Sequence, residues 1–273
     1  MNKITVITIN YNNKKGLEKT FLSVCNQTNK NFEYIVIDGG STDGSAKLLE
    51  EYVEQINYFV CENDNGIYHA MNKGIKVATG DFIVFMNSGD VFYNETIIDS
   101  IVNALNENDE IVYGDVLLKN ELTGYENIQI HPEKLTFKYF YQQTICQQAC
   151  VIKKSLFDTV FYFNENHRIV SDWEFLIVAI FIKKVSARKI PFVVAVFDCE
   201  GISSNQIMRT ISSKEKEQVL ESYFPLFKDD YKKLHSFSSL KFEQLLMIQK
   251  SKLFSRLVSV IFFVILMFIP QKK

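Results

Sequence analysis

The chain of 273 residues is poor in the residues that mark several protein classes. Its 4 Pro and 11 Gly exclude collagen-like and linker-dominated chains. The 5 Cys form an odd set without a C-x-x-C pair and the 4 His are scattered, which argues against a disulfide framework and a zinc site. The net charge of −2 excludes a generally basic nucleic-acid-binding protein. The first residues lack a signal-peptide pattern, so we expect a reducing, cytoplasmic environment.

The residues that are abundant predict a globular chain with two electrostatic environments. Hydrophobic residues make up 47% of the chain and aromatic residues 14%, enough for a sizeable core. Residues 1–204 carry 18 Lys and Arg against 26 Asp and Glu, whereas residues 205–273 carry 12 against 6. This asymmetry favours cation-assisted chemistry in the first part and an anionic partner or surface for the second.

Short β-branched runs alternate with helical patterns over the first part of the chain. Strands are expected at 4–9, 32–37, 58–61 and 82–86, with helices at 17–26, 46–56 and 70–78 between them. This alternation predicts an α/β domain with an open, mostly parallel sheet flanked by helices. Further strands are expected at 111–116 and 191–197 and a helix at 171–182. We divide the chain into 1–115, a less regular 116–204, and a helical, basic and apolar extension at 205–273.

Three polar loops, at 10–13, 38–44 and 87–90, each follow a predicted strand. The carboxyl ends of parallel strands meet at one edge of a sheet, so we expect Asp38 and Asp90 to lie in one crevice. A carboxylate at position 38 can accept hydrogen bonds from a nucleobase or a ribose, and one at position 90 suits Mg²⁺ or Mn²⁺. Each loop alone is equally an ordinary strand-to-helix turn, and the weight lies in their combination.

The runs TINYNN, VIDGGSTDGS and NGIYHAMNKGI, followed by KVATGDFIVFMNSGD, resemble the inverting glycosyltransferases of family 2, which have the GT-A fold. The closest likeness is to bacterial enzymes that build lipopolysaccharide and other cell-surface polysaccharides. The likeness is dense over 1–115 and thinner over 116–204. It implies transfer of a sugar, with inversion, from a nucleoside-diphosphate donor (usually a UDP-sugar) to a hydroxyl of a saccharide or lipid-linked saccharide acceptor.

The resemblance also implies roles for individual residues. Asp90 stands at the last position of the family's DxD motif and would bind Mn²⁺ or Mg²⁺, although Ser88 replaces the first Asp. The stretch ending at Asp172 resembles the one that carries the catalytic aspartate, which would take the proton from the acceptor hydroxyl. The nucleotide-sugar would contact Asn10, Tyr11, Asn12, Asp38, Gly39, Gly40, Asp64, Asn72, Lys73, Ser88 and Gly89, and the acceptor side would include Gln148, Trp173 and Gly201. The alternative for Asp172 is a residue at a helix start, with Trp173 in the core.

The end of the chain is apolar between basic residues. Residues 257–269 are interrupted only by Ser259 and would form a helix of about 20 Å, short of the roughly 30 Å hydrocarbon core of a bilayer. Lys250, Lys252 and Arg256 precede it. We expect peripheral contact with the inner face of the plasma membrane; the alternative is a helix packed on the body or in a dimer.

Two other functions remain open at this point. A non-catalytic, nucleotide-binding scaffold is one, because the DxD motif is reduced. A sugar nucleotidyltransferase is the other, although residues 10–16 lack the Gly-rich, basic signature of that class.

Overall fold

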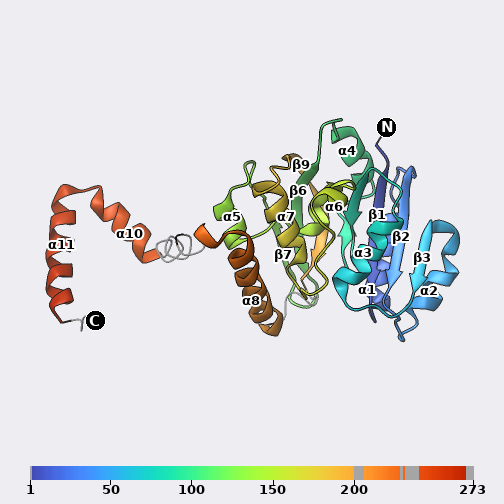
Figure 1. The fold of residues 1–273 in the computed structure, drawn as a ribbon, viewed down its shortest axis with the longest axis horizontal. Helices are drawn as coiled ribbons and strands as arrows, with labels where there is room; N and C mark the ends of the chain where they lie inside the picture. Colours follow the sequence, from blue (N-terminus) through green and yellow to red (C-terminus); the bar gives the residue numbers. More distant parts are fainter. Residues whose placement is uncertain (1, 200–205, 228–229, 231–239, 269–273) are drawn as a thin grey trace. The chain divides into compact units, whose positions relative to one another are not determined.

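The computed structural model describes residues 2–199, 206–227, 230 and 240–268 (Figure 1). The chain divides into two compact units, Met1–Val219 and Leu220–Lys273. This boundary lies inside helix α8 (Gln206–Tyr223), so most of α8 belongs with the first unit. The extension that the sequence predicts from residue 205 therefore differs from this boundary, which follows Val219.

The first half of unit 1 is the predicted α/β arrangement. Its parallel strands lie in the order β3-β2-β1-β4, with β1 (Ile4–Asn10) buried along its whole length in the centre. The other strands are β2 (Phe32–Asp38), β3 (Tyr58–Cys61) and β4 (Phe82–Phe85); the helical segments are α1 (Lys14–Cys25), α2 (Ser45–Glu51), η1 (Val53–Gln55), α3 (Ile67–Val77) and α4 (Ile97–Ala104). Strand-to-helix alternation, with β1, β2 and β4 buried on both faces and β3 at the edge, therefore gives the expected mostly parallel sheet.

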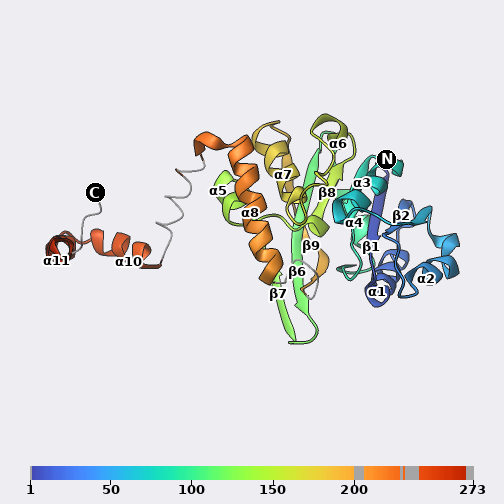
Figure 2. The same ribbon diagram turned by 60° about the horizontal axis from the view of Figure 1, so that its bottom comes forward.

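The second half extends the same sheet with strands of mixed direction. Beyond β4 the order is β8, β6, β9 and β5, in which β8 is antiparallel to β4 and β6, and β9 is parallel to β6. The strands are β5 (Val91–Phe92), β6 (Ile111–Asn120), β7 (Tyr125–Gln129), β8 (Cys150–Lys153) and β9 (Ala187–Asp198); the helical segments are α5 (Phe137–Gln142), η2 (Gln147–Ala149), α6 (Leu156–Thr159) and α7 (Ser171–Phe181). The strands expected at 111–116 and 191–197 and the helix expected at 171–182 are confirmed. Figure 2 shows the long β6–β7 hairpin.

Within the described residues all nine strands belong to one sheet, so residues 2–115 and 116–199 form one continuous scaffold. A core of aliphatic and aromatic side chains from both halves packs against it, including Phe21, Tyr34, Phe82, Val112 and Val194. The sheet therefore fixes the positions of loops that are far apart in the chain.

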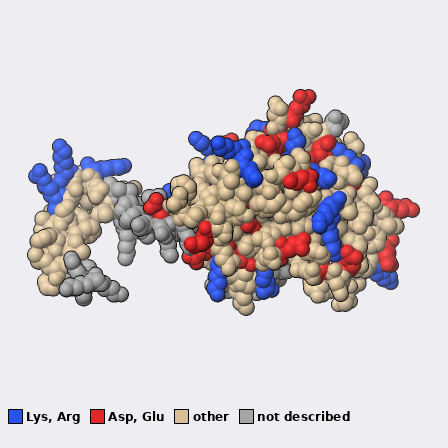
Figure 3. Space-filling model, in the orientation of Figure 1, with Lys and Arg blue, Asp and Glu red and all other residues tan. Residues whose placement is uncertain are grey.

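The second unit contains α10 (Leu240–Gln249) and α11 (Lys252–Met267). The apolar side chains of α11 are exposed, for example Leu253 at 70% and Phe263 at 63%. Lys and Arg side chains gather near the start of α11 (Figure 3). Over the part of the chain that the structure describes, no helix is both long and apolar enough to cross a membrane.

Candidate active site

Asp38, at the end of β2, joins the first two polar loops. It is fully buried and stands beside Asn10 in the β1–β2 register. Its Oδ2 atom accepts hydrogen bonds from Asn10 Nδ2 (2.7 Å) and the Ser41 hydroxyl (2.8 Å). Its Oδ1 atom accepts from the backbone N–H groups of Gly40 (3.1 Å) and Ser41 (2.7 Å) and from the Cys61 thiol (3.1 Å). Asp38 thus holds the loop shape, and its contact with a nucleobase remains a prediction.

The loop after β1 is tied to the loop after β2. The backbone N–H of Asn12 donates to the Ser41 hydroxyl (2.7 Å), and the Thr42 N–H donates to Asn12 Oδ1 (2.8 Å). Asn12 has a positive φ of 48°, a left-handed conformation that asparagine tolerates. Tyr11 is 64% exposed, so its ring is available at the surface of this loop.

The glycine pair after β2 makes room for a third loop. A Cβ atom on Gly39 would lie 2.5 Å from Asp64 Oδ2, and one on Gly40 would collide with the Asn63 side chain. Gly40 also has a φ of +82°, which side-chain-bearing residues rarely adopt. Asp64 is held in place because its Oδ1 accepts the Gly66 N–H (2.8 Å). The pair is needed for close approach of residues 63–64.

The loop after β4 also joins this edge of the sheet. Asn13 Nδ2 donates to the Ser88 carbonyl oxygen (3.2 Å), and the Ser88 hydroxyl donates to the Asn13 carbonyl oxygen (3.1 Å). The amide oxygens of Asn10 and Asn87 are buried without a hydrogen-bond partner in the described part of the chain. The polar loops after β1, β2 and β4 therefore contact one another as the sequence predicts, with buried acceptors among them.

Asp90 is a buried carboxylate, 5% exposed. Its Oδ2 atom accepts from Gln148 Nε2 (2.6 Å) and its Oδ1 atom from the Asp198 N–H (3.0 Å). Burial raises the pKa of Asp90 to about 7; the Asp198 charge raises it further, whereas the two hydrogen bonds and the Lys19 charge lower it. The Asp90 carboxyl group is therefore poised between its neutral and ionised forms near neutral pH.

Asp198, which sequence reasoning missed, supplies a second carboxylate beside Asp90. Its Oδ2 atom would lie 3.4 Å from a Cβ atom on Gly89. Two neighbouring carboxylates that repel each other fit a hard divalent cation, which takes one or two protein carboxylates when it also binds phosphates. Among the described residues, no three acidic, His or Cys side chains gather into a complete metal site. The only sequence signal was the position of Asp198 directly after the strand expected at 191–197.

Asp172 lies in the first turn of α7, and the Tyr68 hydroxyl donates to its Oδ1 atom (2.9 Å). Burial raises the pKa of Asp172, while the Tyr68 hydrogen bond, the Trp173 backbone N–H and the charge of Lys216 lower it. Because burial is the largest of these effects, the pKa of Asp172 stays above its ordinary value, and its carboxylate is a stronger base than that of an exposed Asp.

The Cys146 side chain lies within reach of the charges of both Asp90 and Asp172. The pKa of its thiol is raised to about 12, mainly by burial and then by the charges of Asp90 and Asp172. Both carboxylates therefore lie close enough to act on one side chain, although 82 positions separate them in the sequence.

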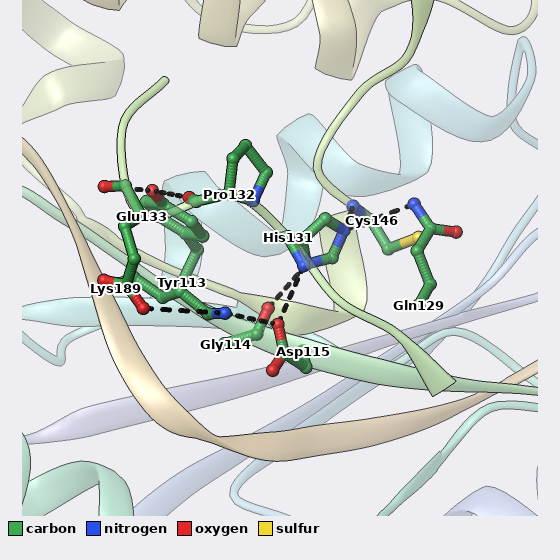
Figure 4. A network of polar contacts seen from close by, with 9 residues as sticks. All are labelled: Tyr113, Gly114, Asp115, Gln129, His131, Pro132, Glu133, Cys146 and Lys189. Atoms are coloured by element: carbon green, nitrogen blue, oxygen red, sulfur yellow. Dashed lines mark hydrogen bonds and ion pairs between the residues drawn. The ribbon is translucent and has the colours of Figure 1, made fainter. Parts of the chain in front are cut away.

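A buried network holds the segment that begins at Cys146 (Figure 4). The fully buried His131 ring contacts the Gly114 carbonyl oxygen through Nδ1 (2.7 Å), and its Nε2 atom accepts the Cys146 N–H (3.3 Å). Asp115 accepts the His131 N–H (2.8 Å) and pairs with Lys189 (3.0 Å). This network fixes the start of η2, which carries Gln148 to Asp90.

The remaining predicted residues have varied surroundings. Asn72 is 3% exposed and donates to the Phe163 carbonyl oxygen and to Glu165, both at 2.8 Å. Lys73 pairs with Glu62 at 2.8 Å. Trp173 is 2% exposed and donates to the Phe140 carbonyl oxygen (2.8 Å), which is the core position that the alternative interpretation gave it. Gly201 lies outside the described residues.

The order of the strands in the sheet and the loops at its carboxyl edge are those of a GT-A fold. Residues 5–161 match the model of glycosyl transferase family 2. The chain belongs to this family.

Relatives of known sequence agree. A PGL/p-HBAD biosynthesis glycosyltransferase of Mycobacterium tuberculosis is 28% identical over 191 residues, which cover 68% of this chain and 73% of the relative. An uncharacterized glycosyltransferase of the same species is 30% identical over 207 residues, covering 74% and 78%.

Two solved structures share the fold. The mannosyltransferase PcManGT from Pyrobaculum calidifontis, in complex with GDP-Man and Mn²⁺, has a TM-score of 0.63 at 16% identity, covering 97% of this chain and 81% of that chain. S. aureus TarS 1-349 in complex with UDP-GlcNAc has a TM-score of 0.62 at 19% identity, covering 90% and 79%.

Proposed function

We propose that the chain transfers a sugar, with inversion, from a nucleoside diphosphate to a hydroxyl of a saccharide or lipid-linked saccharide in cell-surface polysaccharide synthesis. The observation that supports the proposal is that the charges of Asp90 and Asp172 both act on the Cys146 thiol, while Asp90 lies in the loop after β4, which contacts the loop after β1. The donors in the two related structures, UDP-GlcNAc and GDP-Man, support a sugar nucleotide as the substrate. We favour a uridine nucleotide on the family resemblance.

A divalent cation fits the Asp90 and Asp198 carboxylates, because it would neutralise two acidic groups that otherwise repel each other in a buried place. When bound there, the ion would supply charge neutralisation for the departing diphosphate. Mn²⁺ in the PcManGT structure supports this choice of ion class.

The protein's own contribution to the chemistry is the base. Asp172 accepts the proton of the acceptor hydroxyl as that oxygen attacks the anomeric carbon, while the bond to the diphosphate breaks on the opposite face. A positioned carboxylate contributes about 10²–10⁴-fold to such a step. A single displacement from the face opposite the leaving group inverts the anomeric centre.

Replacing the base separates binding from catalysis. Asp172→Asn keeps the shape and can still accept the Tyr68 hydrogen bond, but it cannot take a proton at neutral pH. We expect transfer to fall by at least about 100-fold while the affinity for the sugar nucleotide is retained. UDP release in the presence of acceptor and Mn²⁺ measures transfer, and calorimetry measures binding. Near-wild-type transfer would remove Asp172 from the mechanism.

The same assay distinguishes the alternative of a non-catalytic scaffold, which the Ser88 replacement in the DxD position favours. A scaffold would bind the sugar nucleotide but would release no UDP from it, with or without acceptor. Metal-dependent release in the wild type, lost in Asp172→Asn, excludes it.

We also propose that α11 contacts an anionic membrane surface on the cytoplasmic side. Its apolar side chains are exposed, Lys250, Lys252 and Arg256 stand at its start, and no acidic residue occurs from 244 to 273. Each basic residue near an anionic lipid surface contributes about 1 kcal/mol, in addition to apolar burial. A lipid-linked acceptor gives such contact a purpose.

Deletion of residues 250–273 tests the membrane proposal. The full chain should sediment with vesicles containing phosphatidylglycerol, less so at high salt, and the truncated chain should stay in the supernatant. Equal sedimentation would contradict the proposal. If only the full chain is dimeric and neither sediments, the helix is a protein interface instead.

A further inference from the structure

Helix α8 reaches the proposed base, although its residues fall in the part that the sequence separates as a tail. Glu215 is 8% exposed and accepts the backbone N–H groups of Arg168 (2.8 Å) and Ile169 (3.1 Å). These two residues belong to the short loop that leads directly into α7 and Asp172. One residue of α8 thus fixes the entry of the helix that carries the base.

The next residue, Lys216, acts on Asp172 itself. Its ammonium group lies 5.1 Å from the centre of the Trp173 ring, next to Asp172 in the chain. Burial lowers the pKa of Lys216, and its charge stabilises the ionised form of Asp172. A half-buried cation over an aromatic ring is held in one place rather than left to move through solvent.

A third contact comes from the opposite side. Tyr68, in α3, is 4% exposed and donates to Asp172 Oδ1 (2.9 Å). Being buried, Tyr68 offers little surface to a substrate. Its hydroxyl can orient the carboxylate by one oxygen and leave proton uptake to the other.

We propose that Glu215, Lys216 and Tyr68 are positioning residues for the base, and that α8 is part of the catalytic apparatus rather than of the tail. The inference rests on the proposed function of Asp172. The Lys216 charge favours the ionised form of the buried carboxylate, Tyr68 sets its orientation, and Glu215 fixes the loop before it. Among the described residues, the charge of Asp172 also acts on the thiols of Cys146, before η2, and Cys150, in β8, whose raised pKa values keep both thiols neutral near neutral pH.

The test is the pH profile of transfer in Lys216→Met, with Lys214→Met, an exposed lysine on the same helix, as the matched control. Removing the Lys216 charge makes Asp172 easier to protonate, so the active, ionised form exists only at higher pH. We expect the acidic limb of kcat to move upward by about one pH unit, because a nearby opposite charge typically shifts a carboxylate by this order. At pH values above the limb kcat should recover, the donor KM should stay unchanged, and Lys216→Arg should restore the wild-type profile.

Tyr68→Phe is the second variant, and it gives the test an outcome if Lys216→Met does not fold. It should also move the acidic limb upward, by less, and lower kcat at the optimum several-fold, with the donor KM unchanged. Far-UV circular dichroism and nucleotide affinity confirm that each variant is folded.

The outcomes separate the two levels of argument. If the wild type transfers no sugar, the proposed function fails. If the wild type is active and Asp172→Asn is inactive, but Lys216→Met and Tyr68→Phe keep the wild-type acidic limb, the positioning role is refuted and the function stands. A KM effect alone would also overturn it, because it would place these residues in binding.

Discussion

The buried Asp90 should make the metal-free protein less stable as the pH rises, and Asp90→Asn should remove this loss. Its pKa is about 7 in the folded state against an ordinary 3.8. At 1.36 kcal/mol per pKa unit the difference is worth about 4 kcal/mol. Between these two values the unfolded chain has released the proton and the folded chain has kept it. The free energy of unfolding therefore falls from about pH 4 upward, and the loss is complete above about pH 7.

Asparagine at position 90 removes the negative charge, but it also removes one hydrogen-bond acceptor. The two oxygens of Asp90 accept from Gln148 and from the Asp198 N–H, and an amide can accept with only one oxygen. Leaving one buried donor unpaired costs about 1–3 kcal/mol at every pH. We therefore expect the variant to be less stable than the wild type below pH 5 and to match or exceed it at pH 8.

Urea unfolding of the metal-free proteins at several pH values measures this crossover. The quantity to compare is the free energy of unfolding of the variant minus that of the wild type, in which the contributions of groups that titrate in both proteins, such as Asp109 and Glu33, cancel. Linkage predicts that this difference rises by roughly 2.5 kcal/mol, in favour of the variant, between pH 5 and pH 8. A difference constant to within about 1 kcal/mol over this range would refute the reasoning. Mn²⁺ at pH 8 should stabilise the wild type alone.

Two further variants test the supports of Asp90. Gln148→Leu removes the amide that donates to Asp90 Oδ2, so the affinity for Mn²⁺ in the presence of UDP should fall about 10-fold by calorimetry; an unchanged affinity would show that Gln148 does not support the metal site. Burial lowers the pKa of His131, so its contribution to stability is present above about pH 6.5 and is lost as the pH falls. Urea unfolding at pH 5 and pH 7 should therefore show a smaller loss of stability at pH 5 for His131→Asn than for the wild type. An equal loss in both proteins would exclude His131 as the cause.

The sequence was sufficient to predict the first half of the sheet and its loops. A short β-branched run such as 4–9 fits a strand covered on both faces, and the helical patterns between such runs fit parallel crossovers. Once the strands are parallel, the loops after β1, β2 and β4 must open at the same edge. The mutual contacts of Asn13 and Ser88 are a consequence of topology.

The contacts that tune each acidic group were not predictable in the same way. Tyr68 and Asp172 are 104 positions apart, and Asp90 and Asp198 are 108 apart. Such pairs depend on how β8, which is antiparallel to β4 and β6, and β9, which is parallel to β6, are added to the sheet, and local sequence patterns do not specify that order. The role of Lys216 was not predictable for a related reason. In the sequence its charge belongs to the basic tail, and only the fold brings α8 next to the start of α7. Trp173, which the resemblance placed on the acceptor side, is buried, as the alternative interpretation expected.

The three predicted acidic residues have different surroundings, and these surroundings divide the work among them. Asp38 accepts five hydrogen bonds within the protein, so it shapes the loops. Asp90 is ionised at neutral pH only at a cost that a nearby cation would offset, so metal and donor should bind together, each strengthening the other. Burial raises the pKa of Asp172, and the Tyr68 hydroxyl and the Lys216 charge, which lower it, belong to the protein itself, so the ionisation of Asp172 does not depend on a metal. We therefore expect the reaction to need a cation for binding of the donor and for departure of the diphosphate. The ionisation of the base should not need one.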